Sequence, residues 1–484
     1  MARKSPVLSR LQQRNIPDWW SNAKFGIFIH WTMAAVPGFA PVGTEFANIL
    51  QSKSKDAYGY TPYVEWYQNS MLFPSSPVSK FHAANYGDAP YHNFRADFEA
   101  GIEAWNPSEW VQQFVDAGAE YVVLVSKHHD GYCLWPSEVE NPHRPGWNSR
   151  RDVVGELAKA VREAGLKFGI YYSGGLDWTF YQRPMGQMSD VLASIPRGDY
   201  PAYAEAQVRE LIDRYQPSVL WNDIAWPDRA DKLYDLFAYY YSQVPDGVVN
   251  DRWQAWSPLM SAVKSRPVAA LIDAGIRRSM KRNGGLVPPP PPHFDVRTPE
   301  YVVFPSVKET PWECVRGMDD SFGHNEASLP EHFISHDDLL WLVTDIAAKG
   351  GNLLLNVGPR GVDGSIPELQ AERLRWLAEW LPRHEAALKN TRPWLDRSVI
   401  IPATSNVRYN VKDHTVYAIV RNPARELILE EVATSPSTTV TTIDGTALRW
   451  RVEENGLAVT LLEAPDSNTP VVVVLTGVSY HSLH

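Results

Sequence analysis

Short apolar runs alternate with helical stretches through most of the first 360 residues, and this alternation constrains the fold most strongly. The runs are apolar at almost every position, which is typical of strands that are buried on both faces. They lie at 24–31, 120–130, 166–175, 218–223, 247–252 and 351–359. Repeated strand–helix units of this size predict parallel strands, and therefore a TIM-like barrel or a doubly wound sheet.

Two of the segments between these runs have clear helical patterns. Residues 107–120 begin with a proline and carry Glu109, which suits the first turn of a helix. Residues 152–166 have apolar side chains at helical spacing, and Gly165 is placed to end that helix. Both segments therefore fit the helical half of a strand–helix unit.

Polar side chains stand at the carboxyl end of nearly every apolar run, and they separate the two candidate folds. They are His30, His128, His129, Asp130, Asp177, Asn222, Asp223, Asp251 and Arg252. In a barrel these ends converge on one face, where active sites lie. The sequence has no Gly-x-Gly-x-x-Gly after its first strand and no Walker-type phosphate loop, so a nucleotide-binding sheet fits less well. We therefore expect an α/β protein with an irregular TIM-like (β/α) barrel.

The pattern changes after Trp394, where short alternating strands are separated by turns. Such a pattern over roughly 90 residues predicts a small β-sandwich. We expect a catalytic barrel over 1–390 and a C-terminal β-sandwich over 391–484.

Residues 254–292 interrupt the strand–helix rhythm of the barrel. They contain six basic residues and one acid, and they end in two glycines and five prolines at 288–292. We interpret them as an inserted surface excursion that is partly helical and is closed by a stiff polyproline segment. Three interpretations stay open for it, namely a mobile loop, a lid or a subunit contact.

The net charge of −10 argues against a nucleic-acid partner. The 19 tryptophans weakly favour a carbohydrate enzyme, because indole rings stack on sugars. Cys133 and Cys314 imply no disulfide framework. The charged N-terminus lacks the apolar core of a secretory signal, and no apolar run reaches about 18 residues. We therefore expect a cytoplasmic protein without a membrane partner.

The pair His128–His129 raises the question of a metal site. Adjacent residues on a strand point to opposite faces, so the pair would not chelate one ion unless the strand had ended. The sequence has no His-x-His or His-Glu-x-x-His, and no Gly-x-Ser-x-Gly nucleophile elbow. We expect neither a metal nor another cofactor. Hydrogen bonds to a neutral ligand suit the histidines better, and a plain polar turn stays an alternative.

Paired carboxylates are the remaining chemistry. Asp223 closes a buried strand, on the same side as Trp221, where an unpaired carboxylate would be costly. A second carboxylate would serve as general acid and base. By position the candidates are Glu65, Asp251, Glu300, Glu309 and Glu313, and spacing alone does not choose among them.

Eight ordered motifs between about 17 and 385 carry a family resemblance. They include KFGIFIHW, EWY, KHHDGYCLW, VLWND, VNDRW, SFGHN and KGGNLLLNVGPRGVDGSIP. In this order they resemble the retaining α-L-fucosidases of glycoside hydrolase family twenty-nine, and bacterial members in particular. The resemblance implies a barrel followed by a β-sandwich, a fucosylated oligosaccharide or glycoconjugate as substrate, and a chain that often forms homo-oligomers.

The resemblance also assigns roles to residues. It implies that Asp223 is the nucleophile and that Glu300, in HFDVRTPEY, is the acid/base, with Glu309 and Glu313 as reserves. The fucose pocket that it implies is lined by His30, Glu65, Trp66, His128, His129, Tyr171, Trp221, Arg252 and Phe322. Arg252 is also expected to help keep Asp223 charged.

One departure from the family pattern is FIHWTMAAVP, where the family commonly has FIHWGxYSVP. The missing glycine and tyrosine predict an altered pocket wall near His30. Three other functions stay open: an α-L-galactosidase or transfucosidase that uses the same site, a non-catalytic fucose-binding protein, and a metal-dependent hydrolase.

Overall fold

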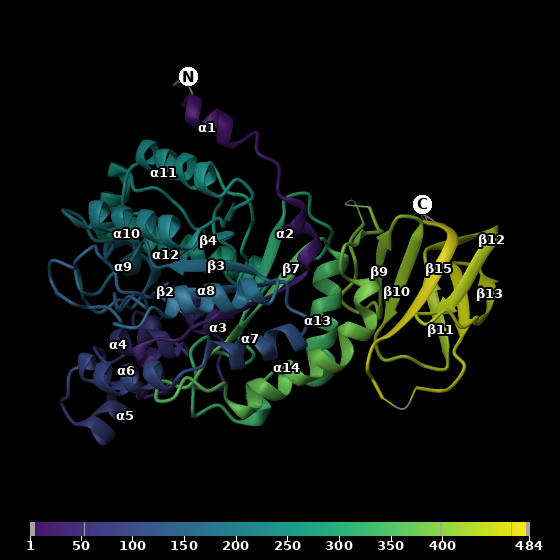
Figure 1. The fold of residues 1–484 in the computed structure, drawn as a ribbon, viewed down its shortest axis with the longest axis horizontal. Coiled ribbons are helices and arrows are strands. Elements are labelled where there is room, and N and C mark those ends of the chain that lie inside the picture. The colour runs from purple at the N-terminus through teal and green to yellow at the C-terminus, as the bar shows by residue number, and fades with distance from the viewer. Residues whose placement is uncertain (1–4, 53, 397–398, 466, 481–484) are drawn as a thin grey trace.

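The computed structural model describes residues 5–52, 54–396, 399–465 and 467–480. Residues 1–4, which begin the segment in which no secretory signal was expected, lie outside this range. A parallel sheet of seven strands forms the centre of the N-terminal part (Figure 1), in the order β5-β4-β3-β2-β1-β7-β6. The strands are β1 (Phe25–Ile29), β2 (Tyr121–Lys127), β3 (Lys167–Tyr172), β4 (Val219–Asn222), β5 (Val248–Val249), β6 (Trp312–Arg316) and β7 (Gly351–Val357).

An irregular segment at 295–300 joins the two edges of this sheet. The backbone N–H groups of Asp295 and Val296 both donate to the carbonyl of Val249 on β5. On the other side, Arg297 and Glu300 form parallel bridges to residues of β6. The expected irregular barrel is therefore confirmed, and its irregular element is the segment that carries Glu300. Pro299 lacks an N–H donor, which suits it to a segment without regular strand pairing.

The helices of the N-terminal part are α1 (Pro6–Leu11), α2 (Asp18–Ala23), α3 (Phe46–Gln51), α4 (Tyr67–Ser70), α5 (Pro77–Tyr86), α6 (Arg95–Ala104), α7 (Pro107–Asp116), α8 (Val153–Glu163), α9 (Met188–Ala193), α10 (Tyr200–Tyr215), α11 (Ala230–Gln243), α12 (Arg266–Asn283), α13 (His336–Ala348) and α14 (Glu368–Trp380). Helices α11, α10, α8, α7, α14 and α13 pack in that order around the sheet. None of the helices in the described ranges is both long and apolar enough to cross a bilayer.

The two helices predicted from sequence end a few residues earlier than expected. Helix α7 begins after Asn106, whose side chain accepts from the N–H of Ser108, and Glu109 lies in its first turn. Helix α8 ends at Glu163, and Gly165 follows with a φ of +83°. The predicted strand over 247–252 is regular only at β5, because Asp251 and Arg252 turn toward the 295–300 segment.

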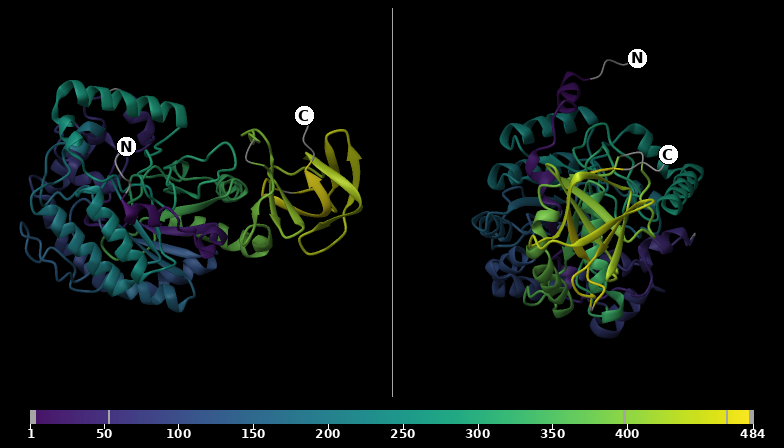
Figure 2. Two further views of the ribbon diagram at one scale, coloured as in Figure 1. Left: turned by 90° about the horizontal axis from the view of Figure 1, so that it is seen from above. Right: turned by 90° about the vertical axis from the view of Figure 1, so that its right-hand side faces the viewer.

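The C-terminal part consists of two antiparallel sheets. Their strands are β8 (Arg392–Pro393), β9 (Val407–Lys412), β10 (Thr415–Val420), β11 (Glu426–Glu430), β12 (Val432–Thr442), β13 (Arg449–Glu453), β14 (Gly456–Thr460) and β15 (Val471–Tyr480). One sheet has the order β12-β15-β10-β9-β8 and the other β11-β14-β13. Buried side chains from both sheets form one apolar core, as the predicted sandwich requires. This part projects from one end of the molecule (Figure 2).

The excursion at 254–292 is more regular than a mobile loop. It contains a 3-10 helix at Pro258–Lys264 and the long helix α12, which ends at Gly284 with a φ of +75°. Helix α12 packs against α3 and α9. The segment is therefore partly helical, as the sequence predicted.

Candidate active site

The residues predicted to form the site gather at the carboxyl ends of the barrel strands. Asp223 follows β4, and its carboxylate has three neighbours of different chemistry. The hydroxyl of Tyr171 donates to Oδ2 at 3.0 Å, and Arg252 Nη1 donates to Oδ1 at 3.1 Å. His129 Nε2 lies 4.0 Å from Oδ2. Most of the carboxylate is therefore enclosed, but its side chain keeps 15% exposure toward the pocket.

The backbone after Asp223 is strained. Ile224 and Ala225 have φ values of +63° and +99°. Residues with a Cβ rarely adopt such values, and β-branched residues such as isoleucine adopt them least of all. Backbone strain of this kind clusters at functional sites, where the surrounding structure holds it in place. The N–H of Gly175 donates to the carbonyl of Asp223, which fixes the strained turn to the end of β3.

Glu300 occupies the 295–300 segment and points toward the same arginine. Arg252 Nη2 donates to its Oε2 at 3.1 Å, and the hydroxyl of Tyr63 donates to Oε1 at 2.5 Å. Arg252 is 8% exposed, so one buried guanidinium bridges Asp223 and Glu300. Two carboxylates on one cation fit the enclosed carboxylate pair that the sequence predicted.

The other candidate carboxylates lie elsewhere. Glu313 is buried on β6, where it accepts from the hydroxyl of Tyr121 at 2.5 Å and from Trp221 Nε1 at 3.4 Å. Glu309 is exposed in the loop that precedes β6. Asp251 accepts from Thr298 and Arg297, and thus clamps the segment that carries Glu300. Neither Glu313 nor Asp251 contacts Arg252 through a hydrogen bond in the described structure.

Glu65 is in the pocket but has a different environment. Its Oε2 accepts from the backbone N–H of Gly323 at 2.9 Å, and the side chain is buried. Burial raises the pKa of Glu65 to about 8, although this hydrogen bond acts in the opposite direction. A carboxyl group that is protonated at neutral pH can both donate and accept a hydrogen bond.

The histidine pair lies where β2 loses its regular register. The pairing of β2 with β3 shifts between Val125 and Lys127, and the strand ends at Lys127. The rings of His128 and His129 therefore lie 4.0 Å apart on the same side instead of on opposite faces. The sequence alone predicted such a change of direction as the condition for both histidines to face one ligand.

Burial keeps the imidazoles neutral. It lowers the pKa of His30 to about 4 and of His129 to about 4, and lowers that of His128 as well. His30 Nδ1 lies 2.6 Å from the side-chain oxygen of Asn356, and His129 Nδ1 lies 2.7 Å from the hydroxyl of Ser173. In the described structure Nδ1 of His128 is buried and has no hydrogen-bond partner.

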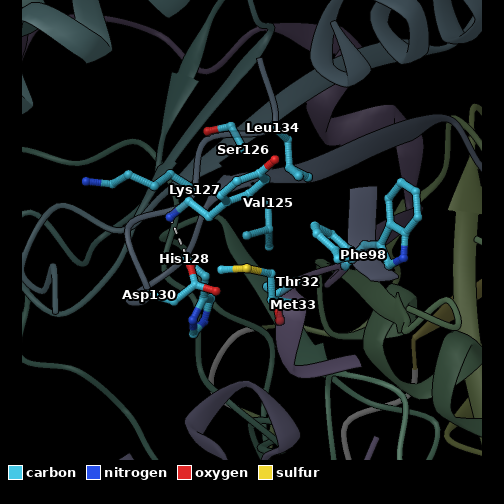
Figure 3. Close-up of a pocket in the computed structure, with 11 residues that line it drawn as sticks. Thr32, Met33, Phe98, Val125, Ser126, Lys127, His128, Asp130 and Leu134 are labelled. Atoms are coloured by element: carbon cyan, nitrogen blue, oxygen red, sulfur yellow. Dashed lines mark hydrogen bonds between the residues drawn. The ribbon is translucent and has the colours of Figure 1, made fainter. Parts of the chain in front are cut away.

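The altered motif FIHWTMAAVP lies behind His128. Thr32 and Met33 line a small pocket together with Val125, Lys127 and His128 (Figure 3). Met33 is fully buried, so its side chain packs as part of the wall. No group of three or more His, Cys, Asp or Glu side chains in the described ranges is arranged to hold a metal ion.

Aromatic rings form the walls of the site. The ring of Tyr171 stacks on Trp221 with centroids 5.3 Å apart, and Phe322 lies 5.0 Å from His30. Trp66 meets the ring of His129 edge-on at 5.2 Å. The aromatic residues, the three histidines and Arg252 that the sequence predicted for the pocket are thus connected by contacts in one cluster, and Glu65 is attached to it through Gly323, next to Phe322.

Four further residues belong to this cluster and were not predicted. Asn356 and Ser173 orient histidines, Tyr63 binds Glu300, and Trp178 meets both Trp66 and His129 edge-on. Asn356 lies inside the motif KGGNLLLNVGPRGVDGSIP, Ser173 lies in the predicted strand over 166–175, and Trp178 follows the polar Asp177, so each had a nearby signal. Tyr63 lies two residues before EWY, and no pattern distinguished it.

Comparisons with known proteins agree with this geometry. A sequence model of the family described as Alpha-L-fucosidase matches residues 2–386. An α-L-fucosidase from Branchiostoma floridae is 30% identical to the chain, over 97% of this chain and 94% of that protein. The structure of Thermotoga maritima α-fucosidase with a mechanism-based inhibitor has 36% identity and a TM-score of 0.79, over 98% of this chain and 100% of that one. The structure of Thermotoga maritima α-fucosidase with fucose has 35% identity and a TM-score of 0.76, over 97% of this chain and 99% of that one.

Proposed function

Since the chain belongs to the α-L-fucosidase family of glycoside hydrolases, we propose that Asp223 and Glu300 hydrolyse terminal α-L-fucosides by double displacement. The observation that carries this assignment is Arg252, which donates to both carboxylates at 3.1 Å. Retaining glycosidases need two carboxyl groups that flank the scissile bond at short range. In the described structure Asp223 and Glu300 share Arg252 as a cation at the carboxyl ends of the strands.

In the first step Asp223 attacks the anomeric carbon. The bond to the leaving oxygen breaks as Glu300 donates its proton to that oxygen, and a covalent fucosyl-enzyme forms. In the second step Glu300 accepts a proton from water, whose oxygen attacks the anomeric carbon. The bond to Asp223 then breaks, and fucose leaves with its configuration retained.

The rest of the site binds the sugar. The imidazoles of His30, His128 and His129 are neutral, so each can exchange hydrogen bonds with hydroxyl groups. Glu65 is suited to hold a further hydroxyl. Trp66, Trp221 and Phe322 supply apolar surface, which suits the C–H faces and the methyl group of fucose.

The test is release of nitrophenol from p-nitrophenyl α-L-fucoside by the wild type and by Asp223→Gly. We expect the variant to lose activity by a factor on the order of 10⁴ or more. Azide should restore part of the nitrophenol release and yield β-fucosyl azide, since a small anion can take the place of the carboxylate. Full activity in the variant would contradict the assignment of Asp223. Greater activity of the wild type on the α-L-galactoside would favour an α-L-galactosidase. Transfer of fucose to sugars in place of water would favour a transfucosidase.

A further inference from the structure

The inner face of helix α12 packs beside the sugar site. Met280 is buried, and Ile276 packs against the same apolar cluster that includes Tyr171, Trp221 and Phe322. Asp273 is also buried, and it accepts from the N–H and the hydroxyl of Ser189 at the start of α9. These contacts fix α12 as a wall next to the mouth of the barrel.

The carboxyl end of α12 is attached to the segment that carries Glu300. The N–H of Glu300 donates to the carbonyl of Leu286 at 2.9 Å, and Leu286 follows the helix by three residues. The fit at Gly285 is close, because a Cβ there would meet the carbonyl oxygen of Glu300 at 2.9 Å. The end of α12 is therefore connected, through Gly285 and Leu286, to the backbone of the proposed acid/base.

The outer part of this helix is strongly basic in a chain of net charge −10. The basic residues of the helix and its approach are Lys264, Arg266, Arg277, Arg278, Lys281 and Arg282, and no ion pair involves them among the described residues. Arg278, Lys281 and Arg282 are exposed.

Helix stability accounts for only part of this charge. Lys281 and Arg282 suit the negative end of the helix dipole, but Lys264 and Arg266 lie at the positive end, where cations are unfavourable. A cluster of one sign along a binding cleft instead raises the local concentration of ligands of opposite charge. Sulfate and carboxylate groups are the anions that lysine and arginine bind with charge-assisted hydrogen bonds.

We propose that the last turns of α12, from Arg278 to Arg282, bind an anionic group on the leaving-group side of the fucosylated substrate. This inference rests on the proposed function, because Glu300 must face the leaving oxygen if it is the acid/base. The glycan next to the released fucose then passes the basic end of α12. A sulfate ester or a carboxylate on that glycan is the ligand chemistry that this surface fits.

The test compares three fucosylated oligosaccharides that differ only in the sugar next to fucose, which is neutral, sulfated or sialylated. We expect a higher kcat/KM for an anionic substrate, and the substrate that gains identifies sulfate or carboxylate as the group. The double variant Lys281→Gln/Arg282→Gln should lose about tenfold on that substrate and little on the neutral one. Arg449→Gln, an exposed charge on the distant strand β13, is the matched control and should leave all three rates unchanged.

Added salt should remove the same preference in the wild type. Equal kcat/KM for the three substrates, or an equal loss on all three in the double variant, would overturn the inference while the fucosidase assignment stands. A wild type that hydrolyses none of the three, nor p-nitrophenyl α-L-fucoside, would overturn the proposed function and this inference with it. Thermal unfolding of the double variant separates an effect on binding from an effect on folding.

Discussion

At the scale of single residues, Glu300 can be distinguished from Glu313 by the dependence on the leaving group. Glu300→Ala removes the proposed proton donor, so we expect hydrolysis of poor leaving groups such as sugars to slow by about 10²- to 10⁴-fold. Nitrophenolate needs little protonation, so the first step with p-nitrophenyl fucoside should be much less affected. Azide should then yield α-fucosyl azide, because it attacks the intermediate in place of water.

Glu313→Gln serves as the matched control for that variant. Glutamine keeps one oxygen, which can accept from Tyr121 and leaves only the longer bond from Trp221 unmade, and Glu313 has no proposed role in proton transfer. We therefore expect its rates to depend on the leaving group as in the wild type. Azide rescue with retained configuration in Glu313→Gln, and none in Glu300→Ala, would exchange the two assignments.

A second prediction concerns Glu65 and the dependence of stability on pH. Burial raises its pKa from an ordinary value of 4.5 to about 8, so the folded protein keeps a proton that the unfolded chain loses between these values. The free energy of unfolding therefore falls as pH rises through this window. Glu65→Gln cannot ionise at this position and therefore lacks this loss. The Tm of the variant minus that of the wild type should increase by roughly 2 to 4 °C from pH 5 to pH 8. Parallel curves of Tm against pH would contradict the shifted pKa.

Much of the site could be predicted at this scale, because each residue follows a recognisable strand end or motif. Asp223 and the histidines are examples. The position of Arg252 between two carboxylates could not be predicted, because it depends on how the 295–300 segment closes the barrel. Tyr63 was missed for a similar reason, since its contact with Glu300 spans 237 positions of sequence.

At the scale of elements, a buried ion pair joins the end of β2 to the loop after β3. Lys127 Nζ lies 2.9 Å from Asp177 Oδ2, and both side chains are fully buried. Burial alone would lower the pKa of Lys127, but the charge of Asp177, its hydrogen bond and the nearby Tyr200 and Cys133 together raise that pKa. The N–H of Trp178, next to Asp177, donates to the carbonyl of His129 at 2.7 Å. The pair therefore positions the loop against the catalytic face.

Lys127→Met should leave the charge of Asp177 buried and unpaired. We expect the free energy of unfolding to fall by roughly 3 to 5 kcal/mol, as measured by denaturant unfolding. The double variant Lys127→Met/Asp177→Leu removes both charges and should recover part of this loss. If the double variant is no more stable than the single one, the cost comes from lost packing rather than from the unpaired carboxylate.

The same scale shows what the sequence pattern could not resolve. Six of the seven barrel strands follow from continuous apolar runs, but β6 has Glu313 in its middle, which hides it from such a search. The 295–300 segment has only bridges and isolated hydrogen bonds to its neighbours, so no strand pattern marks it. Both exceptions carry or adjoin functional carboxylates, where polar residues replace the usual apolar ones.

At the scale of the whole molecule, the barrel and the C-terminal sheets meet through side chains that are themselves buried. Arg408 on β9 is 1% exposed and pairs with Asp345 on α13, which also binds Lys349 at 2.8 Å. Trp380 Nε1 on α14 donates to the carbonyl of Pro470 at 3.0 Å. Helix α13 lies beside β9 (Figure 1). The two parts are therefore expected to unfold together rather than one after the other.

Arg408→Met tests this coupling. The guanidinium of Arg408 binds Asp345 and also packs over the ring of Trp341 at 4.7 Å. Without it, Lys349 is the remaining cation beside Asp345 at this junction. We expect the wild type to show one calorimetric transition. In the variant the C-terminal sheets should unfold at a lower temperature than the barrel. Their free energy of unfolding should fall by roughly 3 kcal/mol or more. Arg451→Met, which breaks an exposed pair with Glu426 inside the small sheet, is the matched control and should change stability by less than about 1 kcal/mol. Two transitions already present in the wild type would show that the buried junction does not couple the two parts.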